Sequence, residues 1–193
     1  MNDETELKHL EAEHYFDELE DMIVQRMRSE ASTSRARAEL MRSTGVDDPV
    51  LIDELSELGI TVDEIIALRF LPLVLVAWAE ETADTGERDV VRAEAAEIGI
   101  HEDSSAWILL DSWLRNRPPG IGVDAWKRYT HKILKNVSPL ATQRLLELTR
   151  KQMTNVAKAS GGHLGFGKVS QKERTMIERL ITIMQEQASP NGQ

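Results

Sequence analysis

Apolar side chains recur every three or four residues along most of the chain, and no segment alternates between apolar and polar positions with a period of two. The first spacing is that of one face of an α-helix, whereas the second would indicate a half-buried strand. The pattern therefore predicts an all-α protein without a sheet. The stretches with helical spacing are 5–43, 61–79, 87–98, 104–116, 123–137, 138–159 and 170–187.

Proline and glycine punctuate this pattern. The run Gly45-Val46-Asp47-Asp48-Pro49 interrupts it after the first stretch, and such a cluster marks a boundary. We therefore divide the chain into a charged N-terminal helical appendage (1–45), a main helical domain (50–187) and a C-terminal tail (188–193). Pro72 lies within the apolar stretch 61–79, where it either kinks a helix or marks its true start.

Two helix starts in the main domain share one sequence pattern. Asp84 is followed three residues later by Glu87, and Ser170, 86 residues further on, is followed in the same way by Glu173. Each pair is typical of a capping box, in which the first side chain accepts from a free backbone N–H and the glutamate reaches back. The repetition predicts a multihelical bundle of two related helix–turn–helix halves, preceded by a long N-terminal helix.

Composition narrows the chemistry and the compartment. The chain has no cysteine, which excludes disulfides, zinc–thiolate sites and thiol nucleophiles. The N-terminus is acidic, unlike a secretory signal, and the longest apolar run, 70–79, is about half the length of a membrane-spanning helix. These features favour a cytoplasmic protein with no transmembrane segment.

The net charge of −10 is unevenly distributed. Residues 121–193 carry 12 Lys and Arg against 5 Asp and Glu, whereas the rest of the chain carries 11 against 28. The basic part fits either an anionic partner or attraction to the acidic part of the same chain or of a second copy, and we favour the second alternative. The acidity elsewhere argues against non-specific binding of nucleic acid.

The turn that precedes the helix at 87–98 is the first candidate site. Four carboxylates lie within eight residues here: Glu80, Glu81, Asp84 and Glu87. Clustered oxygen ligands suit a hard cation such as Ca²⁺ or Mg²⁺, although the EF-hand spacing is not matched, because Ala83 and Arg92 occupy ligand positions. The alternative, which the residues favour, assigns Asp84 and Glu87 to capping and leaves the other two carboxylates in solvent.

A glycine-rich stretch at 161–168 is the second candidate. Gly162 to Lys168 has the spacing of a phosphate-binding loop, but Val169 stands where the magnesium-binding Ser or Thr belongs, and the stretch follows a helix. Nucleotide hydrolysis is therefore not expected. The remaining alternatives are a weak anion site and, more simply, a helix C-cap. The single Glu-x-x-His, at 11–14, lacks the second copy of a di-iron bundle, nothing resembles a catalytic triad, and we expect no enzyme.

The apolar stretch 71–79, followed by the acidic turn ending in Asp84-Thr85-Gly86-Glu87, resembles the TerB-like family of tellurite-resistance-associated proteins. The glycine-rich stretch leading to Lys168-Val169-Ser170 and Glu173 is similar to the second junction of that fold. The likeness spans roughly 50–187. It implies an all-helical domain linked to tellurite and other chemical-stress responses, with acidic turn residues that have been suggested to bind metal ions.

Carried over residue by residue, the resemblance implies a divalent cation at Glu80, Asp84 and Glu87. Asp84 and Glu87 match the family directly, and Glu80 stands where the family has aspartate. Two positions depart from the pattern: Glu81 replaces a glycine, and Phe166 replaces the acidic residue of the second junction.

These observations support two functional hypotheses. The first is a non-enzymatic TerB-like module that acts in stress response through protein contacts, with Ca²⁺ or Mg²⁺ at the acidic turn. Its N-terminal helix would dock a protein partner or a second copy. The second is a structural adaptor that self-associates through its oppositely charged parts, and whose acidic turn only caps helices.

Overall fold

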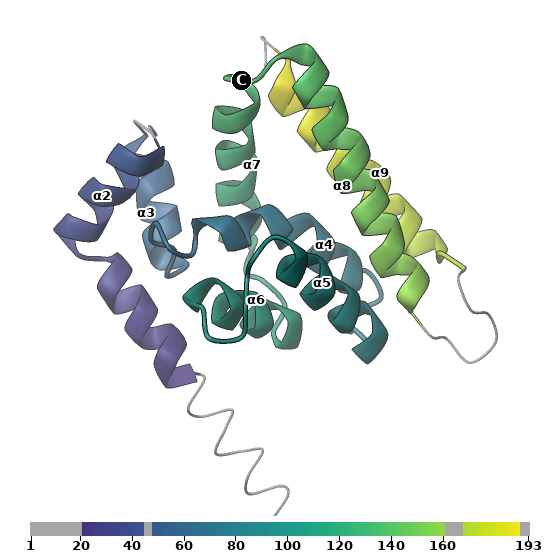
Figure 1. Cartoon of the computed structure of the whole chain (residues 1–193), viewed down its shortest axis with the longest axis horizontal. Coiled ribbons are helices and arrows are strands. Elements are labelled where there is room, and N and C mark those ends of the chain that lie inside the picture. The colour runs from purple at the N-terminus through teal and green to yellow at the C-terminus, as the bar shows by residue number, and fades with distance from the viewer. Residues whose placement is uncertain (1–20, 45–47, 161–167, 190–193) are drawn as a thin grey trace, which may run out of the picture.

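The computed structural model describes residues 21–44, 48–160 and 168–189 (Figure 1). Within these ranges all regular elements are helical and no strand occurs, which confirms the all-α class for the described part of the chain. After helical residues 21–31 come α2 (Ser34–Thr44), α3 (Pro49–Glu57), the 3₁₀ helix η1 (Ile65–Phe70), α4 (Leu71–Ala77), α5 (Thr85–Glu97), α6 (Ser105–Arg115), α7 (Gly120–Leu134), α8 (Pro139–Ala159) and α9 (Gln171–Ala188).

The long helix predicted over 5–43 is interrupted at Ser32 and Thr33. The Ser32 and Thr33 hydroxyls donate to the carbonyls of Ser29 and Glu30 at 2.8 and 2.9 Å, and Thr33 Oγ1 accepts from the Ala36 N–H at 3.1 Å. Hydroxyl side chains offer the backbone an alternative to helical hydrogen bonds, so one helix ends and α2 begins. Residues 5–20 of the predicted helix lie outside the described ranges.

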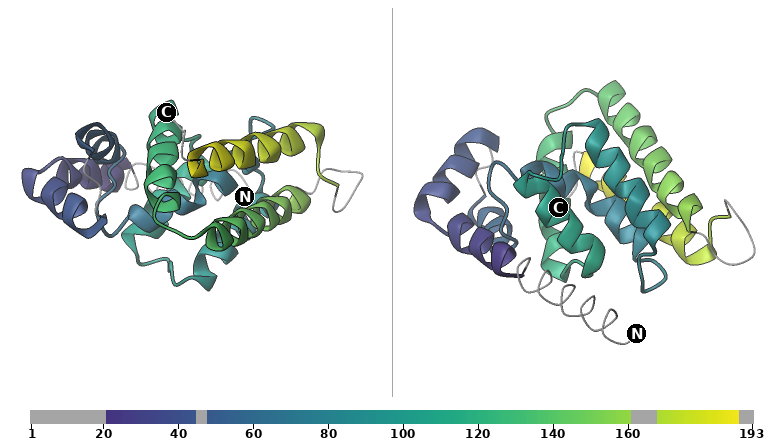
Figure 2. Two further views of the ribbon diagram at one scale, coloured as in Figure 1. Left: turned by 90° about the horizontal axis from the view of Figure 1, so that it is seen from above. Right: turned by 60° about the horizontal axis from the view of Figure 1, so that its bottom comes forward.

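The described part of the N-terminal appendage joins the core of the main domain. Met27 and Leu40 are buried in the same apolar cluster as the residues of α3 and α4, and α2 packs against α3. These two helices lie at one end of the molecule, and the pair α8 and α9 lies at the other (Figures 1 and 2).

Helix α4 is the centre of the core. All seven of its residues are buried, and it packs against η1, α5, α6, α7, α8 and α9. A helix that is apolar all round is stable only when neighbours cover every face. Pro72 lies in its first turn, where a missing N–H removes no hydrogen bond. Of the two predicted alternatives, proline therefore marks the start of the helix.

Side-chain caps begin the later helices. Ser104 caps α6, and Ser138 caps α8 with Pro139 as its first residue. Helices α5 and α7 begin earlier than predicted, at Thr85 and Gly120 instead of residues 87 and 123. Trp113 and Trp126 are buried, and Trp78 Nε1 donates to the carbonyl of Trp113 at 2.9 Å. None of the described helices is both long enough and apolar enough to cross a membrane.

Candidate functional site

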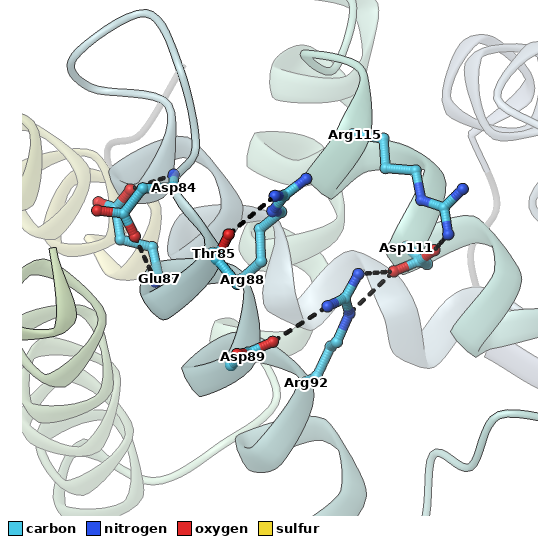
Figure 3. A network of polar contacts seen from close by, with 8 residues as sticks. All are labelled: Asp84, Thr85, Glu87, Arg88, Asp89, Arg92, Asp111 and Arg115. Atoms are coloured by element: carbon cyan, nitrogen blue, oxygen red, sulfur yellow. Dashed lines mark hydrogen bonds and ion pairs between the residues drawn. The ribbon is translucent and has the colours of Figure 1, made fainter. Parts of the chain in front are cut away.

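The start of α5 is a complete capping box (Figure 3). The Asp84 carboxylate accepts from the Glu87 N–H at 2.9 Å, and the Glu87 carboxyl group accepts from the Asp84 N–H at 2.9 Å. Two of the free N–H groups at the helix start are thus satisfied by side chains three residues apart. The predicted pairing of Asp84 with Glu87 is confirmed.

The start of α9 repeats this geometry. Ser170 Oγ accepts from the Glu173 N–H at 3.3 Å, and Glu173 Oε2 accepts from the Ser170 N–H at 2.5 Å. The second predicted capping box is confirmed as well.

The two capping-box glutamates meet in the interior. Glu87 is 3% exposed and Glu173 is 0% exposed. Burial raises the pKa of Glu87 from 4.5 to about 8; the Asp84 N–H opposes this shift, and the charges of Asp84 and Glu173 and a side-chain hydrogen bond with Glu173 add to it. Glu87 is therefore protonated at neutral pH.

The proton on Glu87 can supply a donor for an otherwise unsatisfied oxygen of Glu173. Glu173 Oε1 is buried and finds no N–H donor among the described residues, and a buried acceptor without a donor is destabilising. A protonated Glu87 is a hydrogen-bond donor, whereas an ionised one only accepts. A protonated Glu87 can therefore donate to Glu173 where the side chains of the α5 and α9 starts meet.

Gly86 brings the start of α5 against the end of α8. A Cβ atom built on Gly86 would lie 2.5 Å from the backbone carbonyl oxygen of Ala159, which is far inside van der Waals contact. Glycine is required here because of close backbone approach rather than for an unusual φ angle.

The acidic turn itself is open to solvent. Glu80 and Glu81 are exposed, and Glu81 has a φ of 77°, a backbone conformation that favours glycine. Glu81 thus holds a left-handed conformation although it carries a Cβ atom.

The predicted cation ligands are only partly brought together. Asp84 and Glu87 share the capping box, whereas Glu80 lies on the exposed side of the turn. Among the described residues, no three His, Asp or Glu side chains are grouped so as to hold a metal ion. The cation site at Glu80, Asp84 and Glu87 stays a prediction, and it requires Glu80 to approach the cap. Residues 161–167 of the glycine-rich stretch lie outside the described ranges, and Lys168 is exposed.

A second polar cluster joins α5 to α6 (Figure 3). Asp111, which is buried on α6, accepts from Arg92 Nε at 2.9 Å and Nη2 at 2.6 Å, and from Arg115 Nη2 at 2.9 Å. Arg92 Nη1 also donates to Asp89 at 3.2 Å. Although burial opposes it, the hydrogen bond and charge of Asp111 raise the pKa of Arg92.

Neither this cluster nor the Glu87–Glu173 contact is predicted from the sequence. The one available signal was Asp111 itself, a carboxylate within the apolar face of α6. Buried carboxylates need charged or hydrogen-bonding partners, but the sequence does not say which arginine supplies them. In this cluster every charge is compensated, and its role is to fix α5 on α6.

Comparisons with protein-family models, with curated proteins and with solved structures find no match for this chain. The TerB-like resemblance therefore rests on the two junctions alone.

Proposed function

We propose that this chain is a non-enzymatic, TerB-like helical module of the cytoplasm that acts through protein contacts in a response to chemical stress. The observation that supports this proposal most is the buried contact of Glu87 with Glu173. Two equivalent helix starts that meet through the same residue of the same motif are what a domain of two related helix–turn–helix halves produces.

The burial of this pair favours a structural role for it. With 3% and 0% of their surfaces exposed, the two glutamates offer a substrate no access. Their hydrogen bonds serve the helix starts and each other. The exposed part of the junction, which carries Glu80 and Glu81, is the part that a ligand reaches first.

A divalent cation at Glu80, Asp84 and Glu87 belongs to this proposal. Carboxylate oxygens are the ligands that Ca²⁺ and Mg²⁺ prefer. Binding would exchange the proton of Glu87 for the cation, because metal ligands must be deprotonated. A cation would then link the exposed turn to the buried pair and stiffen the junction.

The test is thermal unfolding of chelator-treated protein in a titration of Ca²⁺ and Mg²⁺. A ligand that binds only the native state raises the melting temperature, so we expect a saturable rise. The rise should shrink in Glu80→Gln, which leaves both capping boxes intact, and persist in the matched control Glu102→Gln, an exposed carboxylate before α6. A flat response, or an equal rise in both variants, would remove the cation from the proposal.

Exposed apolar side chains near the N-terminal end favour the second candidate, a self-associating adaptor. Met22 and Val50 are 58% and 53% exposed, although the nearby Val24, Met27 and Leu40 are buried. Deleting the whole appendage would remove core residues Met27 and Leu40, so Met22→Gln is the sharper test. An adaptor predicts a dimer by sedimentation that dissociates in this variant and weakens as salt rises. A monomer at all protein concentrations would contradict it.

A further inference from the structure

A cavity of about 480 Å³ lies between η1, α4, α7, α8 and α9, away from both helix starts. Most of its lining is aliphatic or aromatic, including Ile65, Trp126, Ile133, Leu145 and Met184. A mostly apolar hollow of this size is typical of a small-molecule site. None of its lining residues belongs to the acidic turn, so a role for this cavity is independent of the proposed function.

Four polar side chains interrupt this lining: Arg69, Tyr129, Thr130 and Thr149. Thr130 and Thr149 are each 7% exposed. Threonine in a helix commonly donates to the carbonyl four residues earlier, as Thr154 of α8 does to Arg150 at 2.8 Å. Within the described ranges, Thr130 and Thr149 make no such hydrogen bond, and both residues line the cavity together with Tyr129.

The charge of the lining is of one sign. Among the described residues that line the cavity, only Arg69 is charged, and it makes no ion pair with a carboxylate of the described ranges. Burial raises the pKa of Tyr129 and the charge of Arg69 partly offsets this, so the phenol is a neutral donor. Arginine, tyrosine and threonine all present N–H or O–H donors. The matching ligand therefore carries an acceptor-rich, anionic group on an apolar body.

We propose that this cavity binds an amphipathic carboxylate of the medium-chain fatty-acid class. The carboxylate pairs with the Arg69 guanidinium and accepts from the Tyr129 hydroxyl, because guanidinium–carboxylate pairs are the strong polar contacts of such sites. The alkyl chain lies among Ile65, Ile133 and Leu145. The Thr130 and Thr149 hydroxyls, which lack a partner among the described residues, supply further donors.

Decanoate, titrated below its micellar concentration into the full-length protein, tests this site. Trp126 lines the cavity, so its fluorescence reports occupancy, and the methyl resonances of Ile66 and Ile133 locate the ligand against that of Ile98, which lies at the end of α5. We expect saturable binding, with shifts at Ile66 and Ile133 and none at Ile98. Decanol, which has the chain without the charge, should bind more weakly than decanoate.

Two substitutions separate the head group from the chain. Arg69→Gln should weaken decanoate at least about tenfold, the range of a charge-assisted hydrogen bond, and leave decanol unchanged. The matched control, Arg179→Gln, neutralises an exposed arginine of α9 outside the cavity and should alter neither. Thr149→Leu, which fills the cavity, should weaken both probes.

Three results would overturn the proposal. They are the absence of saturable decanoate binding, an equal affinity of wild type and Arg69→Gln for decanoate, and shifts that miss Ile66 and Ile133. A dimer that Arg69→Gln dissociates and decanoate does not compete would assign the cavity to an acidic protein segment instead. Residues 1–20, which carry eight Asp and Glu against one Lys, would be the first segment to examine.

Discussion

The starts of α5 and α9 have the same local structure and different surroundings. Both are capping boxes with glutamate at the third helical position. In α5 the cap is the carboxylate of Asp84 and the second position is Gly86, which touches the backbone of α8. In α9 the cap is the hydroxyl of Ser170 and the second position is Lys172, which is exposed.

The same capping motif is therefore held in place by different contacts at the two helix starts. The α5 start contacts the end of α8 through Gly86 and the side chain of Glu173 through Glu87, so packing constrains its residues. At the α9 start Glu173 is buried and Val169 packs against the core, while Gln171 and Lys172 face solvent. Charge differs as well, because the Asp84 carboxylate raises the pKa of Glu87, whereas a serine cap carries no charge.

The largest expected effect on stability comes from the second residue of each helix, Gly86 in α5 and Lys172 in α9. Gly86→Ala should lower the free energy of unfolding by about 2–3 kcal/mol, because a methyl group at 2.5 Å from a backbone oxygen forces α5 and α8 apart. Lys172→Ala, at the equivalent position of α9, should change it by less than about 0.5 kcal/mol. Urea unfolding of both variants measures the difference. Equal effects would show that the close approach to α8 does not constrain α5.

The second prediction is that stability depends on the proton held by Glu87. The pKa of Glu87 rises from 4.5 to about 8 on folding, so the folded state holds the proton more tightly than the unfolded state. This stabilisation is complete below pH 4.5 and is lost as the pH rises through about 8, with a slope of at most about 1.4 kcal/mol per pH unit. Between pH 6 and pH 8 we expect a loss of about 1–2 kcal/mol, measured by urea unfolding.

Glu87→Gln tests the cause of that pH dependence. The amide keeps a donor toward Glu173 and an acceptor for the Asp84 N–H but does not titrate. The variant should therefore show a flatter profile and exceed the wild type in stability above pH 8. Glu102→Gln should keep the wild-type slope. If the slope survived in Glu87→Gln, another group would be its source.

The substitution Asp84→Ser gives α5 the same cap residue as α9. Asp84→Ser removes the carboxylate that helps to raise the pKa of Glu87 and keeps a capping oxygen. The cost in stability at pH 6 should be below about 1 kcal/mol, since serine and aspartate are comparable N-caps. The midpoint of the pH profile should move to lower pH. A midpoint that stayed in place would mean that burial and Glu173 alone set the pKa.

The smallest effect is expected in the acidic turn. Glu81 occupies a φ of 77°, which is unfavourable for a residue with a Cβ atom. Glu81→Gly should stabilise the protein by up to about 1 kcal/mol, because relief of this strain exceeds the added entropy of the unfolded chain. Glu97→Gly, in the last turn of α5, should destabilise it by about as much. Thermal unfolding measures the two changes, a higher melting temperature for Glu81→Gly and a lower one for Glu97→Gly.

The local features of this protein could be predicted from short stretches of its sequence. The two capping boxes, the start of α4 at Pro72 and the caps of α6 and α8 all depend on residues within three or four positions of one another, so the pattern contains the full cause. The all-α class follows from the same periodicity. The break at Ser32 and Thr33 also has a local cause, but the apolar stripe that continues on both sides of it favours one long helix.

Which helix starts and charged groups meet is a property of the packed molecule. Glu87 and Glu173 are 86 residues apart. The raised pKa of Glu87 depends on burial that arises only when α5, α8 and α9 pack. The pairing of Arg92 with Asp111 and the cavity beside Arg69 likewise depend on how helices cross. Periodicity predicts which face of a helix is buried but not which neighbour covers it, because many helix partners bury an apolar face equally well.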